Sequence, residues 1–111
     1  MYYIIIMKLI GIEWDEEKNI RNIQDHKLSF EVAQYVFTDP ERIERFDRSE
    51  SNISEEERWQ TVGKVGSVFF VVYTERGKDK RIITARKADK TERRIYNGYY
   101  QIDTGGWSKT S

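Results

Sequence analysis

Residues 58–96 read RWQTVGKVGSVFFVVYTERGKDKRIITARKADKTERRIY, and this stretch decides the fold. It contains three strand-like runs followed at once by the start of a helix. The middle run, 68–73, is unbroken, apolar and rich in β-branched and aromatic residues, as is typical of a central strand covered on both faces. Gly66-Ser67 before it predicts a two-residue hairpin turn, and 81–85 after it returns as the next strand. The stretch therefore predicts an antiparallel β-meander that leads into a helix.

The N-terminal part of the chain predicts a strand and two helices. The opening residues, 2–14, are apolar enough for a first strand or an extended lead-in. Asp15 and Ser29 each have a side chain that can cap the backbone N–H groups of a following helix. In the first of these helices Ile20 and Ile23 share one side, which we expect to face the core. These elements and the meander together predict an α+β fold.

Three further segments are weaker signals. Residues 42–46 alternate enough for an edge strand, where charged side chains would prevent unwanted pairing. Ser54 and Glu57 have the spacing of a capping box and could open one helical turn. Asp89 and Glu92 have the same spacing and would open the last helix.

Length and composition restrict the class of protein. The 111 residues suit one domain, which we place at 1–98, followed by a tail, 99–111, that could be partly ordered and dock on the domain or on a partner. Aromatic residues make up 14% of the chain, more than a disordered chain contains. Cysteine is absent, which excludes disulfides and thiolate chemistry and fits a reducing cytoplasm. The apolar opening is too short to span a bilayer, so we expect no membrane association.

Basic residues carry the main functional signal. The formal net charge is 0, so any attraction to nucleic acid must come from local clustering. One such cluster follows the meander and comprises Arg81, Arg86, Lys87, Lys90, Arg93 and Arg94. Guanidinium groups bind phosphate oxygens bidentately, and Arg58 on the first meander strand could lie near this cluster. The competing interpretation is a solvated charged face.

Geometry limits how the arginines can cooperate. Arg81 and Arg86 are five positions apart, and this odd separation puts them on opposite faces of a regular strand. A β-bulge between them would be needed to bring both to one site.

Candidates for proton transfer are few. His26 is the only histidine, and its unperturbed pKa of about 6.5 suits general acid or base work. It could equally cap the end of the first helix, where a cation is favoured by the helix dipole. Tyr96 could donate from its hydroxyl or be a core residue, and Glu57 could be a base or the ion-pair partner of Arg58. No metal-ligand spacing and no phosphate-binding glycine loop is present, so we expect neither a metal nor a cofactor.

Three blocks of the chain, in their order and spacing, carry a resemblance. The first, within 13–40, contains Glu13-Trp14-Asp15, Lys18, Asn22, His26, Phe30, Ala33, Phe37 and Asp39-Pro40. The second is the run from Glu57 to Gly63, and the third contains Arg81 to Ala88, Glu92-Arg93-Arg94 and Tyr96. Together these blocks resemble the BrnT family of type II toxins. The family commonly has Gly after the His, where this chain has Lys27; a left-handed turn there would cost Lys roughly 1 kcal/mol.

The resemblance implies both a fold and a function. It implies a RelE-like fold, with two N-terminal helices packed on an antiparallel β-meander sheet and a C-terminal helix. It implies a ribonuclease that cleaves RNA and inhibits translation. The implied partner is a BrnA-like antitoxin with a ribbon-helix-helix DNA-binding end. The toxin–antitoxin complex would repress its own operon, and it would contact the operator DNA only through the antitoxin.

These expectations give a hypothesis for the site. RNA cleavage would be metal-independent, with Arg58, Arg81 and Arg86 holding the phosphate and His26, or else Tyr96 or Glu57, moving a proton. The remaining basic residues would bind RNA; they are Lys87, Lys90, Arg93 and Arg94. The alternative hypothesis is a non-catalytic module that only docks an antitoxin or nucleic acid.

Overall fold

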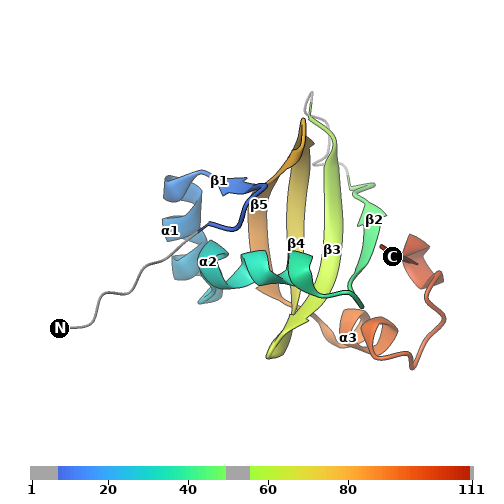
Figure 1. Cartoon of the computed structure of the whole chain (residues 1–111). Coiled ribbons are helices and arrows are strands. Elements are labelled where there is room, and N and C mark those ends of the chain that lie inside the picture. The colour runs from blue at the N-terminus through green and yellow to red at the C-terminus, as the bar shows by residue number, and fades with distance from the viewer. Residues whose placement is uncertain (1–7, 50–55, 111) are drawn as a thin grey trace.

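A six-stranded sheet with the order β1-β5-β4-β3-β2-β6 organises the chain (Figure 1). The computed structural model describes residues 8–49 and 56–110. The strands are β1 (Ile12–Trp14), β2 (Ile43–Phe46), β3 (Arg58–Val65), β4 (Ser67–Arg76), β5 (Asp79–Lys87) and β6 (Ser108–Lys109). β1 pairs with β5 in parallel, and every other pairing is antiparallel. The fold is α+β as predicted, but the sheet is mixed and the prediction of a purely antiparallel one is wrong.

β4 is the central strand of the meander, as the sequence predicts. Its Val71 packs in the core cluster on one face of the sheet and its Val72 in the cluster on the other face. The preceding turn differs from the prediction. Lys64 pairs with Val68 and Val65 pairs with Ser67, so the chain reverses around Gly66. A two-residue turn would instead have two residues between the last paired positions. Gly66 takes the positive φ, 72°, that this tight reversal needs.

The α-helices begin where the sequence predicts. They are α1 (Glu16–His26), α2 (Phe30–Ala33), which continues as the 3₁₀ helix η1 (Gln34–Thr38), and α3 (Lys90–Tyr96). A further 3₁₀ helix, η2 (Thr104–Gly106), lies in the tail, where no helix was predicted. Asp15 caps α1 by accepting from two backbone N–H groups, and Ser29 caps α2 by accepting from Val32 N. Asp89 and Glu92 form a reciprocal capping box at α3. The three capping predictions are confirmed.

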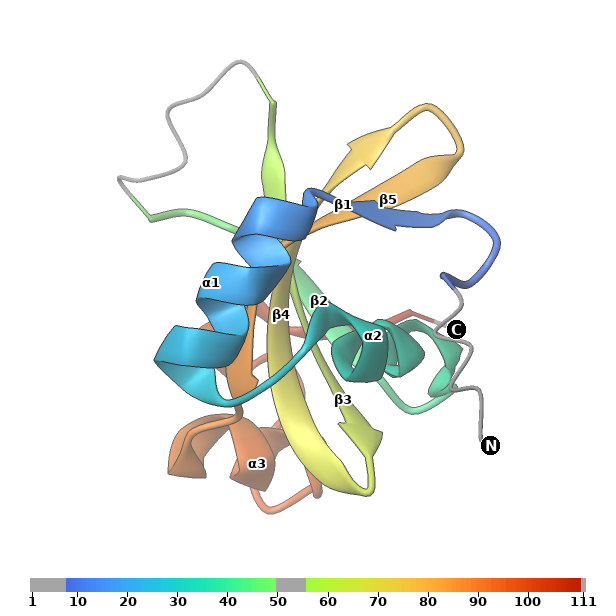
Figure 2. The same cartoon turned by 90° about the vertical axis from the view of Figure 1, so that its left-hand side faces the viewer.

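The helices cover the sheet unequally (Figures 1 and 2). α2 and η1 pack on one face, where Phe30, Ala33 and Val36 join the first core cluster. α3 covers part of the other face, where Ile95 packs with Trp107 in the second cluster. α1 lies beside β5, at the edge that β1 leaves open (Figure 2).

α1 docks through polar side chains, which corrects the expectation for its apolar residues. Asn19 and Asn22 are its buried residues, whereas Ile20 and Ile23 are 52% and 42% exposed. The helix ends at Lys27, whose φ of 56° is the left-handed conformation that glycine commonly supplies.

Both ends of the chain modify the expected sheet. The first strand is Ile12–Trp14 alone; the part of this prediction that falls on residues 1–7, like the helical turn expected at Ser54, lies outside the described residues. A strand at 42–46 is confirmed, but it is not an edge, because β6 pairs along its outer side. Trp107, 3% exposed, anchors the C-terminal segment on the domain. None of the helices within 8–49 and 56–110 is long and apolar enough to cross a membrane.

Candidate functional site

Arg58 and Arg81 occupy equivalent places on the two strands that flank β4. Arg58 on β3 is opposite Thr74, and Thr74 is opposite Arg81 on β5. Residues directly opposite one another in an antiparallel pair point to the same face. The two arginines therefore stand on one face of the sheet, with their Cα atoms about 10 Å apart, which is two strand spacings. Thr74 lies between them, 1% exposed, and its hydroxyl donates to the carbonyl of Glu57 at 2.8 Å.

A β-bulge decides which face Arg81 and Arg86 share. The register pairs Val72 with Thr84 and Tyr73 with Ile82, so that Ile83 is the extra residue. Arg81 and Arg86 therefore lie opposite Thr74 and Phe70, which are an even number of residues apart on β4 and share a face. The β-bulge that is needed to bring Arg81 and Arg86 to one face of the sheet is therefore present.

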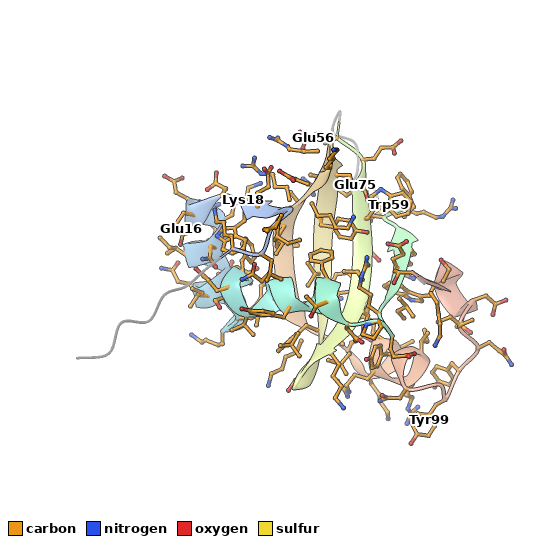
Figure 3. All side chains as sticks on the ribbon, in the orientation of Figure 1. Glu16, Lys18, Glu56, Trp59, Glu75 and Tyr99 are labelled. Carbon is orange, nitrogen blue, oxygen red and sulfur yellow. The ribbon has the colours of Figure 1, made fainter. Side chains whose placement is uncertain are left out.

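Arg58 and Arg81 border one surface hollow of about 400 Å³. Its lining residues are Lys18, Glu56, Arg58, Thr74, Arg76, Arg81 and Ile83. Figure 3 labels Lys18 and Glu56, which border it from α1 and from the segment before β3. Two carboxylates lie near these cations: Glu56 binds Arg76 at 2.7 Å, and Glu13 lies 3.6 Å from Arg81. Four cationic side chains around one open hollow attract an anion more than the neutral chain as a whole does.

An adjoining hollow extends this site along α1. The two hollows share Lys18 and Ile83, and the second also contains Arg21 and His26. Lys18, Asn22 and His26 are four residues apart, so they lie along one side of α1 over about 12 Å. His26 is exposed in the last turn of the helix. The structure thus places His26 in a hollow that adjoins the hollow of Arg58 and Arg81.

Asn22 fixes α1 in this position. Its side-chain amide donates to the carbonyls of Leu28 at 2.8 Å and Ala85 at 2.9 Å, and its oxygen accepts from the Ala85 N–H at 3.1 Å and the Thr84 hydroxyl at 3.3 Å. The side chain thereby satisfies the backbone of β5 where β1 no longer pairs with it. The orientation of α1, and with it the position of Lys18, depends on this side chain together with Asn19, whose oxygen accepts from the Phe30 N–H at 2.8 Å.

Arg86 is engaged elsewhere. Its guanidinium binds both carboxylate oxygens of Glu92, at 2.8 and 3.0 Å, and stacks 3.9 Å above the centre of the Phe70 ring. The hydrogen bonds to Glu92 raise the pKa of Arg86 further above its usual value. Arg86 does not line the hollow of Arg58 and Arg81. Its role as a phosphate ligand stays a prediction.

The two other proton-transfer candidates lie outside both hollows. The Tyr96 hydroxyl donates to Asp39 at 2.6 Å, and burial together with that hydrogen bond raises the pKa of Tyr96 well above its usual value. Tyr96 is on α3, at the other end of the sheet. Glu57 is exposed and directly precedes β3.

The expected RNA-binding residues gather at the end of β5 that is remote from Arg81. Lys87 is six residues beyond Arg81, which is about 20 Å along a strand. Lys90 is exposed in the first turn of α3, and Arg93 donates to the carbonyl of Ala88 at 2.7 Å. Arg94 donates to the Tyr100 hydroxyl at 3.0 Å. The basic residues therefore form two separate groups rather than one.

Three cationic residues of the two hollows were not among the predicted site residues: Lys18, which the resemblance alone named, Arg21 and Arg76. The four-residue steps from Lys18 to Asn22 and from Asn22 to His26 were a signal that these residues lie along one side of a helix. Arg76 carried no such signal, because its place beside Arg58 depends on the strand register.

A small α+β domain with a cationic hollow at one end of its meander strands is the class that these observations define. The family model described as the ribonuclease toxin, BrnT, of type II toxin–antitoxin systems matches residues 14–92. This is more than half of the chain, and the chain belongs to the BrnT family of ribonuclease toxins.

A solved structure is similar in fold. The crystal structure of the Brucella abortus ribonuclease toxin, BrnT, superposes with a TM-score of 0.51 at 20% sequence identity. The alignment covers 71% of this chain and 96% of that one, so part of this chain has no counterpart there. No curated protein sequence matches the chain.

Proposed function

We propose that this chain is a toxin that cleaves RNA endonucleolytically without a metal ion and thereby inhibits translation. The observation that carries the proposal is the placement of Arg58 and Arg81 on either side of Thr74, facing one hollow that Lys18 also borders. A relation of the fold to RelE-like ribonucleases belongs to the same proposal and is supported by helices before and after the antiparallel meander.

The proposed reaction is an internal transesterification. The ribose 2′-oxygen forms a bond to the adjacent phosphorus while the bond from phosphorus to the 5′-oxygen breaks. The products are a 2′,3′-cyclic phosphate and a 5′-hydroxyl, so no water or cofactor enters this step. Arg58 and Arg81 would bind the non-bridging oxygens, where negative charge increases in the transition state, and one such donor typically contributes about 10² to 10³ in rate.

His26 is the proposed proton-transfer residue. The 2′-hydroxyl must lose a proton and the 5′-oxygen must gain one, and a positioned base or acid contributes about 10² to 10⁴ in rate. Support for His26 is its place in the hollow that shares Lys18 with the arginine site. Glu57, next to Arg58 in the chain, is the second candidate. Tyr96 is the weakest, because its hydroxyl is bound to Asp39.

The remote basic group would bind RNA away from the scissile phosphate. Lys87 and Lys90 are exposed and available for phosphate contacts, whereas Arg93 and Arg94 also bond within the chain. Such contacts contribute affinity that decreases as salt increases.

The proposed partner is a BrnA-like antitoxin with a ribbon-helix-helix DNA-binding end. Support for an antitoxin comes from the family, whose members belong to type II toxin–antitoxin systems. Operator DNA would then be contacted by the antitoxin and not by this chain.

The test is cleavage of RNA by the purified chain in the presence of EDTA. The expected products carry 2′,3′-cyclic phosphate ends, and their yield does not change when EDTA is added. RNA that stays intact, with normal growth of cells that express the chain alone, would favour the non-catalytic module. Cleavage that EDTA abolishes would remove metal independence from the proposal.

A further inference from the structure

Two isoleucines are exposed on the outward side of α1, although the helix docks on the domain by its other side. Asn19 and Asn22 are 1% and 5% exposed, while Ile20 and Ile23 are about half exposed. Asn19 is held by the Phe30 N–H, which donates to its oxygen at 2.8 Å, and by its own amide, which donates to Glu31. Amide hydrogen bonds therefore attach α1, and the isoleucines are left for another surface. Contiguous exposed apolar side chains mark interaction sites more often than isolated ones do.

α2 continues this apolar surface. Val32 is 43% exposed and borders, together with Ile23, a hollow of about 430 Å³ between α1, α2 and the start of β4. The floor of this hollow is formed by Leu28 and Phe69, both buried in the first core cluster. Figure 2 shows α1 and α2 on the same side of the molecule.

The rim of the hollow is basic. His26, Lys27, Ser29 and Lys87 complete its lining, and none of the described residues that line it carries a carboxylate. Lys27 is fixed by its place at the C-cap of α1, where its N–H donates to the Ile23 carbonyl at 2.9 Å. An occupant that fits this hollow presents apolar side chains flanked by acidic ones.

We propose that this hollow and the adjoining isoleucines are the docking surface for the antitoxin, which inserts apolar side chains beside Asp or Glu residues. A second copy of this chain fits less well, because a two-fold contact would place Lys27 and Lys87 against basic residues of the same patch. RNA also fits less well, because four of the lining residues are apolar: Ile23, Leu28, Val32 and Phe69.

His26 connects this surface with the ribonuclease site. It lines both the docking hollow and the hollow that shares Lys18 with Arg58 and Arg81. An antitoxin segment seated against Ile23 would cover His26 and exclude RNA from it. Neutralisation would then be direct obstruction of the site, an inference that rests on the proposed function.

The experiment compares exposed apolar positions inside and outside the patch. Ile23→Asp and Val32→Asp place a carboxylate in the docking surface, and Ile10→Asp changes an apolar side chain that is fully exposed elsewhere. The probe is the purified product of the reading frame adjacent to the gene of this chain. Its Kd is measured by calorimetry, and circular dichroism checks the fold of each variant.

We expect Ile23→Asp and Val32→Asp to raise the Kd at least about tenfold, while Ile10→Asp changes it less than about twofold. Without the antitoxin, the Ile23→Asp variant should cleave RNA at the parental rate. Added antitoxin should inhibit this variant less than it inhibits the parent. If either aspartate variant fails to fold, Lys27→Glu tests the same rim by charge reversal and should also raise the Kd.

Parental Kd values for the folded patch variants would overturn the docking surface. So would a dimer of the chain alone that Ile23→Asp converts to a monomer, because a second copy would then be the occupant. Failure of the proposed function is separable from both outcomes. If the chain cleaves no RNA but Ile23→Asp abolishes antitoxin binding, the docking surface stands and the proposed function fails. If the chain cleaves RNA but binds the antitoxin through other residues, the proposed function stands and the docking surface fails.

Discussion

Arg58 and Arg81 both stand opposite Thr74, one on each of the two strands that flank β4. Thr74, between the two guanidinium groups, has a small side chain. Because its hydroxyl donates to the Glu57 carbonyl, it does not compete for a phosphate. Lys18 approaches the same hollow from α1. Three cations from three separate segments are thus held on a rigid frame.

Loss of either arginine should reduce catalysis without unfolding the chain. We expect Arg58→Ala and Arg81→Ala each to lower kcat for RNA cleavage by about 10² to 10³, because each removes a donor to the charged transition state. Arg58→Lys should recover only part of the rate, since Lys keeps the charge but not the planar pair of donors. Single-turnover cleavage assays measure the effect.

Lys64→Ala is the matched control, because it removes an exposed cation outside the hollow, six residues along β3 from Arg58. Its cleavage rate should stay within about twofold of the parent, as expected for a solvated charge far from the reacting atoms. A folded Arg58→Ala variant with full activity would remove Arg58 from the site.

His26→Gln separates proton transfer from helix capping. If His26 moves a proton, the rate should decrease by about 10² to 10⁴ while the melting temperature hardly changes. If it only stabilises the last turn of α1, stability should decrease by about 0.3–1 kcal/mol with no change in rate. Asp25→Asn, which alters the same hollow without removing the imidazole, is the control for both measurements.

Local chemistry made much of the fold predictable. Asp15, Ser29 and the Asp89–Glu92 pair cap helices through hydrogen bonds to residues two or three positions away. Donor and acceptor are therefore close together in the sequence, and a short motif is enough to predict the bond. The central strand was predictable because a run that is apolar on both faces has few other places in a sheet.

The position of α1 and the shape of the site were not predictable in the same way. Asn22 is buried because it bonds to Ala85, 63 residues along the chain, and nothing near Asn22 in the sequence indicates that partner. Ile20 and Ile23 then face outward, against their hydrophobicity. The placement of Arg81 and Arg58 on either side of Thr74 likewise depends on the strand register around Ile83. A pattern of residue types does not specify that register.

Tyr96→Phe should alter stability and its pH dependence but not catalysis. Partial burial pushes the pKa of Asp39 upward, but the Tyr96 hydroxyl and two backbone N–H groups outweigh this effect and hold the pKa below the usual 3.8. A lowered carboxyl pKa stabilises the fold above the unfolded-state pKa, and that stabilisation is lost as the pH falls through the folded-state pKa. Removal of the hydroxyl should therefore cost about 1–3 kcal/mol at neutral pH and progressively less below about pH 3.8.

Urea unfolding of the parent and of Tyr96→Phe from pH 3 to pH 7 measures this dependence. RNA cleavage at neutral pH, well below the melting temperature, should be unchanged. A large loss of cleavage rate in a folded variant would instead support Tyr96 as a proton-transfer residue. A stability difference that stays constant across the whole pH range would show that the hydroxyl does not act through Asp39.

Gly63→Ala should destabilise the chain through close packing of β3 on η1. A Cβ at this position would lie 2.6 Å from Cγ1 of Val36 and 3.2 Å from its carbonyl oxygen, so a strand or a helix must shift. Overpacking of this kind costs about 1–3 kcal/mol. Denaturant unfolding should show the loss, whereas Lys64→Ala, next in the strand and exposed, should remain within about 0.5 kcal/mol of the parent. A neutral Gly63→Ala would mean that η1 can move away without cost.

Asn22→Ala should detach α1 from β5 and disturb the site at a distance. The substitution leaves the N–H and carbonyl of Ala85 and the carbonyl of Leu28 without their partner, and a buried unsatisfied group costs about 1–3 kcal/mol. We expect a loss of about 3 kcal/mol in denaturant unfolding. Because Lys18 and His26 lie on the same side of α1, cleavage should also slow at a temperature where the variant is still folded. Gln24→Ala, at an exposed position of the same helix, should change neither quantity. A variant that loses stability but cleaves RNA at the parental rate would show that the site does not depend on how α1 is attached.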